Sequence, residues 1–309
     1  MKGRVINLNG GVYKVILEDG TIKDFKARGK LRAEKVYQSN DKSLSKKKNP
    51  TTVKSSPKVG DIVVIDNDMI DHYEPRKNSL IRPDIANVDQ IVLVFAAKEP
   101  DFSFYLLDLF VINIVKNNIL PVIVITKVDK LNDEEYKNLK ENMKYYESLG
   151  YKVLYVNNIN GDGRDDVLSI LKDKITILSG QTGAGKSSLV NTLIPGFALE
   201  TQEISDALGR GKHTTRQISL YPFMGGLLGD TPGFSKLEAT LLGLKCEELN
   251  NLFIEFKNYN CRFSDCNHLE NAKDCGIRKA VDEGLILKSR YLSYVKLYNE
   301  LKSRRIIWR

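Results

Sequence analysis

A glycine-rich turn stands between the apolar run 175–179 and a helical pattern. It consists of Gly180, four residues, and then Gly185, Lys186 and Ser187, which is the spacing of a phosphate-binding loop. Glycines allow a tight turn whose N–H groups point at phosphate oxygens, and the following helix adds partial positive charge. We expect Lys186 to bind the β- and γ-phosphates and Ser187 to ligate Mg²⁺. The expected nucleotide contacts are Gly180, Gln181, Thr182, Gly183, Ala184, Gly185, Lys186, Ser187 and Ser188.

A second motif, earlier in the chain, concerns the base of the nucleotide. Thr126, Lys127, Val128 and Asp129 directly follow the apolar run 121–125. The carboxylate of Asp129 can accept hydrogen bonds from the N1–H and the exocyclic amine of guanine, whereas adenine has no matching pair of donors on that edge. We expect the stem of Lys127 to lie along the base. This motif therefore predicts a guanine nucleotide.

Three further nucleotide-site residues are expected downstream of the phosphate-binding loop. Thr215 is the candidate switch threonine that ligates Mg²⁺, Asp230 is expected to hold Mg²⁺ through water, and the Gly233 amide is expected on the γ-phosphate. In most phosphate-loop GTPases the base motif comes after the loop, but here it comes before it. The motif order therefore predicts a circularly permuted GTPase that hydrolyses GTP to GDP and phosphate.

The residue that would orient the attacking water is absent from its usual position. Phe234 follows Gly233, where Ras-like GTPases have a glutamine, and a phenyl ring cannot polarise water. We therefore expect slow intrinsic hydrolysis that a partner accelerates. His213 is the nearest candidate to position water; the alternative is an exposed switch-loop residue. The next base-contacting segment is expected after the run 152–156, where Asn157 and Asn158 can offer side chains or backbone amides to guanine O6; the sequence leaves open which of them makes a contact, if any.

Three cysteines and one histidine lie within fifteen residues near the end of the chain. They are Cys261, Cys266, His268 and Cys275. Three thiolates and one imidazole match a closed tetrahedral zinc site with a structural role, and a cytosolic chain makes little use of disulfides. The alternative is a set of unconnected buried thiols. Cys246 stands apart from this group.

The elements that must position these residues fall into three predicted domains. Residues 1–72 alternate apolar and polar side chains in short runs, which predicts an OB-type β-barrel with a Lys-rich loop at 38–58. Residues 73–237 alternate buried-strand runs with helical patterns, which predicts an α/β GTPase domain with a parallel sheet covered by helices on both faces. Residues 238–309 form the predicted zinc-binding, mostly helical domain.

Composition limits the class of protein and of partner. The chain has 309 residues, 42% of them hydrophobic, which suffices for packed cores. No apolar run approaches the ~20 residues that span a bilayer, so we expect a cytoplasmic protein without a membrane partner, present as a monomer. The net charge of +8 favours an anionic partner, and nucleic acid fits best. The helical pattern 277–301 interleaves basic residues with tyrosines, which suits RNA or, alternatively, a solvated helix with a tyrosine core stripe.

The whole chain resembles the ribosome small-subunit-dependent GTPase family (RsgA/YjeQ). Besides the motifs above, the resemblance rests on 76–78, 82–83, 85–90, 99–102 and 209–216. It implies a bacterial factor that binds the 30S ribosomal subunit and its 16S rRNA, assists late maturation, and hydrolyses GTP when the subunit stimulates it. It also implies one structural zinc, together with Mg²⁺ that accompanies the nucleotide.

Two departures from common patterns and two alternative functions accompany this interpretation. Thr126 stands where many GTPases have asparagine, which predicts one weaker hydrogen bond at the guanine or at the phosphate loop. The segment from His268 to Cys275 is one residue longer than the usual family spacing. The alternative functions are a nucleotide-dependent RNA-binding module and a permuted GTPase that acts on the large subunit.

Overall fold

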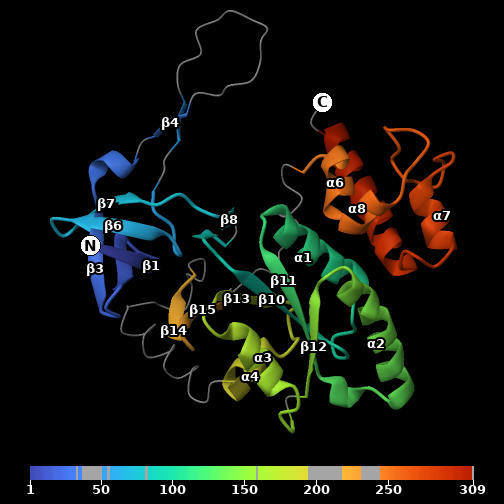
Figure 1. The fold of residues 1–309 in the computed structure, drawn as a ribbon, viewed down its shortest axis with the longest axis horizontal. Helices are drawn as coiled ribbons and strands as arrows, with labels where there is room; N and C mark the ends of the chain where they lie inside the picture. Colours follow the sequence, from blue (N-terminus) through green and yellow to red (C-terminus); the bar gives the residue numbers. More distant parts are fainter. Residues whose placement is uncertain are drawn as a thin grey trace, which may run out of the picture. The chain divides into compact units, whose positions relative to one another are not determined.

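The computed structural model describes residues 1–32, 34–36, 51–53, 56–80, 83–157, 159–193, 218–230 and 244–307 (Figure 1). The chain divides into two compact units. The first contains residues 1–88 and, of the described residues further on, 218–222. The second contains the remaining described residues, including the whole described C-terminal part.

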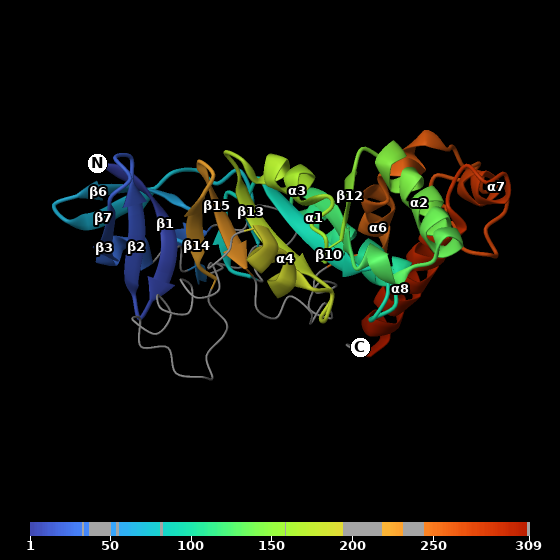
Figure 2. The same ribbon diagram turned by 90° about the horizontal axis from the view of Figure 1, so that it is seen from below.

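The first unit is built on a closed barrel with strand order β1-β2-β3-β7-β6. Its blue strands β1, β2 and β3 lie side by side in Figure 2. Alternate residues such as Tyr13, Val15, Val63 and Ile65 are buried inside it. This barrel confirms the predicted N-terminal fold. The strands of this part of the unit are β1 (Lys2–Asn9), β2 (Val12–Leu17), β3 (Ile22–Ala27), β4 (Glu34–Val36), β5 (Thr51–Val53), β6 (Ile62–Asp66) and β7 (Met69–Tyr73), with the 3₁₀ turn η1 (Gly29–Arg32).

The segment after the barrel, residues 74–88, is bonded to the barrel unit. Arg76 forms two hydrogen bonds with the fully buried carboxylate of Asp61, at 2.8 and 2.7 Å. Asn78 both donates to and accepts from the backbone of Val88. The two short strands β8 (Ser79–Leu80) and β9 (Ile85–Ala86) pair in this segment. These signature residues of the family therefore have structural bonds within the first unit.

The second unit contains a parallel sheet with strand order β12-β11-β10-β13-β15. All seven residues of β10 are buried, which requires cover on both faces of the sheet. The α/β expectation is thereby confirmed. Its strands are β10 (Gln90–Ala96), β11 (Leu120–Thr126), β12 (Lys152–Val156), β13 (Ile175–Gly180) and β15 (Gly226–Asp230), and β14 (Leu220–Phe223) spans the boundary of the two units. Its helices are α1 (Phe104–Lys116), α2 (Asp133–Ser148), α3 (Arg164–Leu171) and α4 (Lys186–Leu193).

The C-terminal part is helical and packs within the same unit, where α8 lies against α1 (Figure 1). Its elements are α6 (Cys246–Leu252), η4 (Ile254–Asn258), α7 (Gly276–Asp282) and α8 (Lys288–Ile307). Arg290, Tyr291 and Tyr294 are buried in α8, so the core-stripe alternative is correct for these three residues and they are not available to RNA. None of the helices in the described part of the chain is both long and apolar enough to cross a membrane.

Candidate functional site

The phosphate-binding loop joins the end of β13 to the start of α4, as its sequence predicts. Gly180, Gly183 and Gly185 all have positive φ, at 134°, 77° and 82°. At Gly180 the need for glycine is strongest, because a Cβ atom there would lie 2.1 Å from the carbonyl oxygen of Val94 on the neighbouring strand. The turn and its approach to β10 therefore both depend on the missing side chain.

Gly180→Ala is expected to lower the free energy of unfolding of the second unit by about 2 kcal/mol or more and to weaken nucleotide binding. The added methyl group meets backbone rather than a flexible side chain, and the φ of 134° is strained for alanine. Denaturant unfolding and nucleotide titration measure the two effects. The control is Gly29→Ala, where the new Cβ meets nothing within 4 Å. Equal stability of the two variants would contradict this explanation.

The base motif and the phosphate-binding loop are joined by two side chains. The buried hydroxyl of Thr126 lies 2.5 Å from the Ala184 carbonyl oxygen and 3.2 Å from that of Phe95. The ammonium of Lys127 donates to the carbonyl of Gly183 at 2.8 Å and to that of Glu99. At the position where many GTPases have asparagine, the Thr126 hydroxyl thus makes a hydrogen bond to the phosphate-binding loop.

The groups expected to contact the nucleotide are accessible next to the contacts of Thr126 and Lys127 with the phosphate-binding loop. Asp129 is exposed in the 3₁₀ turn η2 (Val128–Lys130), which follows Lys127 in the left-handed conformation at φ 57°. Lys186 is half-buried, and Ser187 is exposed at the start of α4. The remaining loop side chains, Thr182 and Ser188, are exposed, while Gln181 is half-buried. This arrangement leaves the Asp129 carboxylate and the polar groups of the loop accessible to a ligand.

One expected base contact has a local structural function. The side-chain oxygen of Asn157 accepts hydrogen bonds from the backbone N–H groups of Ile159 and Asn160, at 2.9 and 3.3 Å. Its amide oxygen thus shapes the turn after β12. Asn158, His213, Thr215, Gly233 and Phe234 lie outside the described residues, and for Asp230 the structure describes only its backbone place at the end of β15.

The segment Glu99 to Phe102 contacts the phosphate-binding loop, although motif analysis assigned it no role. The side-chain amide of Gln181 donates to the Asp101 carbonyl at 3.2 Å, and Lys127 holds the Glu99 carbonyl. Glu99 also forms an ion pair with Lys130. One signal in the sequence was available: the segment follows the buried strand β10, and parallel strands end at the same edge of a sheet.

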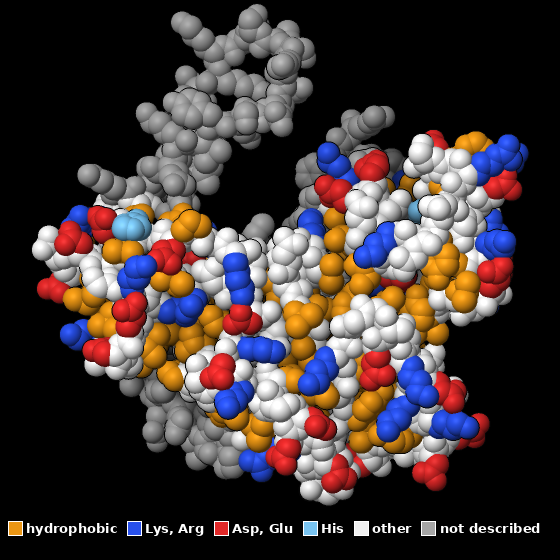
Figure 3. Space-filling model, viewed as in Figure 1, with side chains coloured by type: hydrophobic (Ala, Val, Ile, Leu, Met, Phe, Trp, Pro, Cys, Tyr) orange, Lys and Arg blue, Asp and Glu red, His pale blue; other side chains and the backbone are white. Residues whose placement is uncertain are grey.

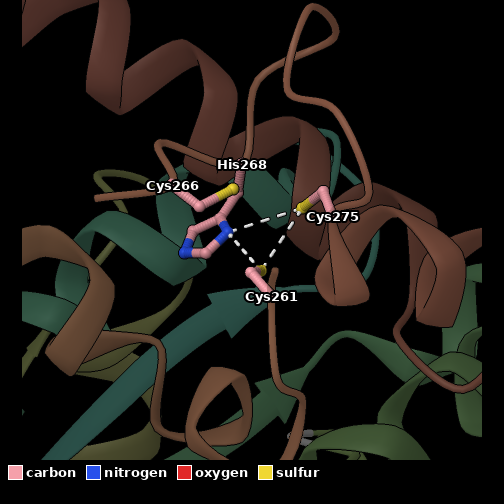
Figure 4. Close-up of side chains that lie close together, drawn as sticks. All are labelled: Cys261, Cys266, His268 and Cys275. Carbon is pink, nitrogen blue, oxygen red and sulfur yellow. Dashed lines mark hydrogen bonds between the residues drawn. The ribbon is translucent and has the colours of Figure 1, made fainter. Parts of the chain in front are cut away.

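The four predicted zinc ligands come together in the C-terminal part, and Figure 4 shows their side chains facing one another. The Nδ1 atom of His268 lies 3.4 Å from the sulfur of Cys261 and 3.5 Å from that of Cys275, and these sulfurs are 3.7 Å apart. With bonds of about 2.3 Å to sulfur and about 2.0 Å to nitrogen, a tetrahedral ion needs ligand separations of about 3.5 Å between nitrogen and sulfur and about 3.8 Å between two sulfurs. All four ligand atoms, Cys266 included, lie within 4.8 Å of one another. The cluster therefore fits one tetrahedral metal ion despite the extra residue in its loop.

Packing and hydrogen bonds from neighbouring helices shape this cluster. The hydroxyls of Tyr291 and Tyr294 on α8 donate to the carbonyls of His268 and Asn267, at 2.8 and 2.9 Å. The His268 ring packs edge-on against Phe256, with centroids 5.5 Å apart. Burial lowers the pKa of His268, which favours the neutral, metal-binding imidazole. The ligand loop is thus held by contacts that do not involve the metal.

The thiols of Cys261 and Cys275, whose sulfurs are 3.7 Å apart, have pKa values shifted in opposite directions. Burial raises the pKa of Cys275 to about 12. Burial also acts on Cys261, but hydrogen bonds from the backbone N–H groups of Ile277 and Gly276 bring its pKa below the ordinary value. The start of α7 therefore favours a thiolate at Cys261, which is the form that binds a metal ion.

Comparison with known proteins agrees with this geometry. The model of a family described as RsgA GTPase matches residues 73–240 of the chain. The chain belongs to the RsgA GTPase family. This assignment makes it a GTPase, a hydrolase that acts on GTP, with the permuted motif order that the sequence predicted.

Relatives of the RsgA GTPase extend the similarity over the whole chain. The proteins named "Small ribosomal subunit biogenesis GTPase RsgA" from Caldanaerobacter subterraneus and from Bacillus subtilis are each 38% identical to it. The first match covers 98% of the chain and 97% of the relative, and the second covers 98% of both.

Two solved structures share its fold. The crystal structure of YjeQ from Thermotoga maritima has a TM-score of 0.77 at 32% identity, covering 97% of this chain and 98% of that one. YloQ, described as a circularly permuted GTPase, has a TM-score of 0.74 at 33% identity, covering 98% of this chain and 95% of that one.

Proposed function

We propose that this RsgA GTPase hydrolyses GTP in the biogenesis of the small ribosomal subunit. The observation that carries the proposal is the joint between Thr126, Lys127 and the phosphate-binding loop, which brings a guanine-selecting carboxylate and a phosphate cradle to one site. The function named for the relatives from Caldanaerobacter subterraneus and Bacillus subtilis supplies the biological setting. We further propose that the chain binds the 30S subunit and its 16S rRNA.

The nucleotide site divides its tasks among a few side chains. Asp129 selects guanine, the loop amides and Lys186 bind the phosphates, and Ser187 holds Mg²⁺ together with Thr215 and Asp230. Bound Mg²⁺ supplies charge neutralisation at the β- and γ-phosphates. The Gly233 amide contacts the γ-phosphate, and His213 positions water or meets the partner.

The cluster of three thiolates and one imidazole holds a single structural zinc ion. Four protein ligands fill a tetrahedral shell, so no position remains for a catalytic water. We assign it to a zinc-binding domain of residues 238–309, beside a GTPase domain of residues 73–237 and an RNA-binding barrel of residues 1–72. We also propose that the protein is a monomer and acts in the cytoplasm, where it would meet the 30S subunit.

The described residues on the face drawn in Figure 3 form no patch of a single charge sign. On the face in Figure 3, Lys and Arg side chains are interspersed with Asp and Glu side chains over the described surface. A single-sign patch is the usual electrostatic sign of nucleic-acid binding.

Steady-state GTP turnover tests the proposal. The purified chain is assayed alone, with 30S subunits and with 50S subunits, and ATP replaces GTP as the control. We expect slow turnover alone, a rise of at least tenfold with 30S subunits only, and no ATP hydrolysis. An equal rise with 50S subunits indicates action on the large subunit. No rise with either subunit indicates an RNA-binding module with incidental turnover.

A further inference from the structure

Arg290 on α8 is a fully buried cation that joins several elements of the second unit. Its guanidinium donates to Asp108 on α1 at 2.6 Å and to Glu255 in η4 at 2.7 Å. It also lies over the ring of Phe253, 4.6 Å from the centroid. Removing one partner of such a group leaves an uncompensated buried charge, which is strongly unfavourable. We call the set Asp108, Glu255 and Arg290 the buried joint.

The buried joint is one of two levels at which α8 is fixed to α1. At the second level, the hydroxyl of Tyr105 donates to Glu300 at 2.8 Å, and the ammonium of Lys296 lies 3.7 Å from the centre of the Tyr105 ring. Positions 105 and 108 are three residues apart, so they share one face of α1. Since both levels hold the same face, sliding of α8 along α1 must break both together.

The same N-terminal end of α1 follows directly from the segment at the nucleotide site. Its N-cap is Ser103, and the preceding segment Glu99 to Phe102 is the one that contacts the phosphate-binding loop. Gln181 donates to the Asp101 carbonyl, and Lys127 donates both to the Glu99 carbonyl and to the loop carbonyl of Gly183. The ring of Phe102 packs at 5.9 Å from that of Phe95 on β10. The phosphate-binding loop, α1 and α8 are thus connected by continuous contacts.

We propose that α1 couples the C-terminal part of the second unit to the phosphate-binding loop, with Arg290 and Asp108 as positioning residues for the stimulated rate of GTP hydrolysis only. This inference rests on the proposed stimulation by the small subunit. The buried joint makes α1 and the zinc-bearing part move as one body, because separating Arg290 from Asp108 and Glu255 would leave buried charges uncompensated. A displacement of α8 therefore moves residues 99–102, which brace the loop that holds the phosphates.

Two variants test this connection. Arg290→Met with Asp108→Asn and Glu255→Gln removes the three charges of the buried joint together, so that no charge is left unpaired. Tyr105→Leu removes the second level and leaves the buried joint intact. The matched control is Tyr136→Leu on α2, a tyrosine whose ring also carries a lysine ammonium, that of Lys140 at 4.6 Å.

The readouts are zinc content, basal GTP turnover, 30S affinity and turnover at saturating 30S subunit. For the triple variant and for Tyr105→Leu we expect zinc content, basal turnover and 30S affinity to stay within about twofold of the parent, and the 30S-stimulated kcat to fall about tenfold. Tyr136→Leu is expected to keep full stimulation. Should the triple variant fail to fold, Tyr105→Leu alone decides.

Three outcomes overturn the proposal. Full stimulation in Tyr105→Leu, and in the triple variant if it folds, means that the contacts of α1 with α8 are only structural. Recovery of kcat at saturating subunit means that the variants weaken subunit binding alone. A fall in basal turnover equal to the fall in stimulated turnover means general damage to the site. If the parent chain is itself not stimulated by 30S subunits, the proposed function fails, which is a different result from failure of the connection.

Discussion

Cys275→Ala is expected to abolish zinc binding and to unfold the ligand loop between Cys261 and α7. Cys275 is buried, its sulfur lies 3.7 Å from that of Cys261, and a site with three ligands cannot complete a closed tetrahedral shell. In zinc-finger peptides such a metal contributes about 10–16 kcal/mol of apparent folding free energy. We expect a smaller loss here, because α8 also packs against α1 and η4.

Metal analysis and limited proteolysis of the purified variant measure this effect. The parent chain should contain one zinc ion, whereas Cys275→Ala should contain none and be cut within residues 261–275. The matched control is Cys246→Ala, which also removes a buried thiol but lies outside the cluster. Full zinc content in Cys275→Ala, or loss of zinc in Cys246→Ala, contradicts the assignment.

Asp129→Asn is expected to weaken GTP binding by about 100-fold or more and to favour xanthosine triphosphate. Each hydrogen bond between a charged group and a neutral donor contributes about 1.5–3 kcal/mol, and the carboxylate is proposed to accept two from guanine. Xanthine carries a carbonyl in place of the exocyclic amine, so an asparagine amide can donate to it. Asp129 is exposed in a short turn, and its replacement should not disturb the fold.

Competition binding with GTP, xanthosine triphosphate and ATP measures the change in base selectivity. Glu134→Gln is the matched control, because it removes an equally exposed carboxylate five residues away in the first turn of α2. The control should bind GTP like the parent. Unchanged GTP affinity in Asp129→Asn would falsify the role of this carboxylate in reading the base.

The sequence was most informative where function depends on local geometry. The phosphate-binding loop is specified by glycines at fixed spacing, and the structure has positive φ at those positions. Residues 91–96 of β10 are all apolar because both faces of the strand are covered. Similarly, the metal cluster is specified by four ligand types within one loop. Local patterns of this kind determine the backbone or the donor set directly.

Contacts between distant residues were not predictable in the same way. The bond from Thr126 to Ala184 joins positions 58 residues apart, so the threonine looked like a defect in a known motif. Arg290 looked like a basic surface residue, yet its partner Asp108 lies 182 residues earlier in the chain. One signal was present: Arg290, Tyr294, Leu297 and Leu301 are buried at the spacing of a helical core stripe. Hydrophobicity does not reveal a buried cation whose counter-ions come from another element.

The strand order of the sheet has a consequence for the synthesis of the protein. β11 pairs with β10 on one edge and with β12 on the other, and these three strands are consecutive in the chain. The other edge of β10 pairs with β13, which begins at Ile175. While the nascent chain grows from Ala96 to Ile175, that edge has no partner strand. At about 5–20 residues per second, this interval lasts about 4–16 seconds. An apolar strand with an open edge invites association with other chains, so this is the period of translation in which a chaperone would protect the protein most.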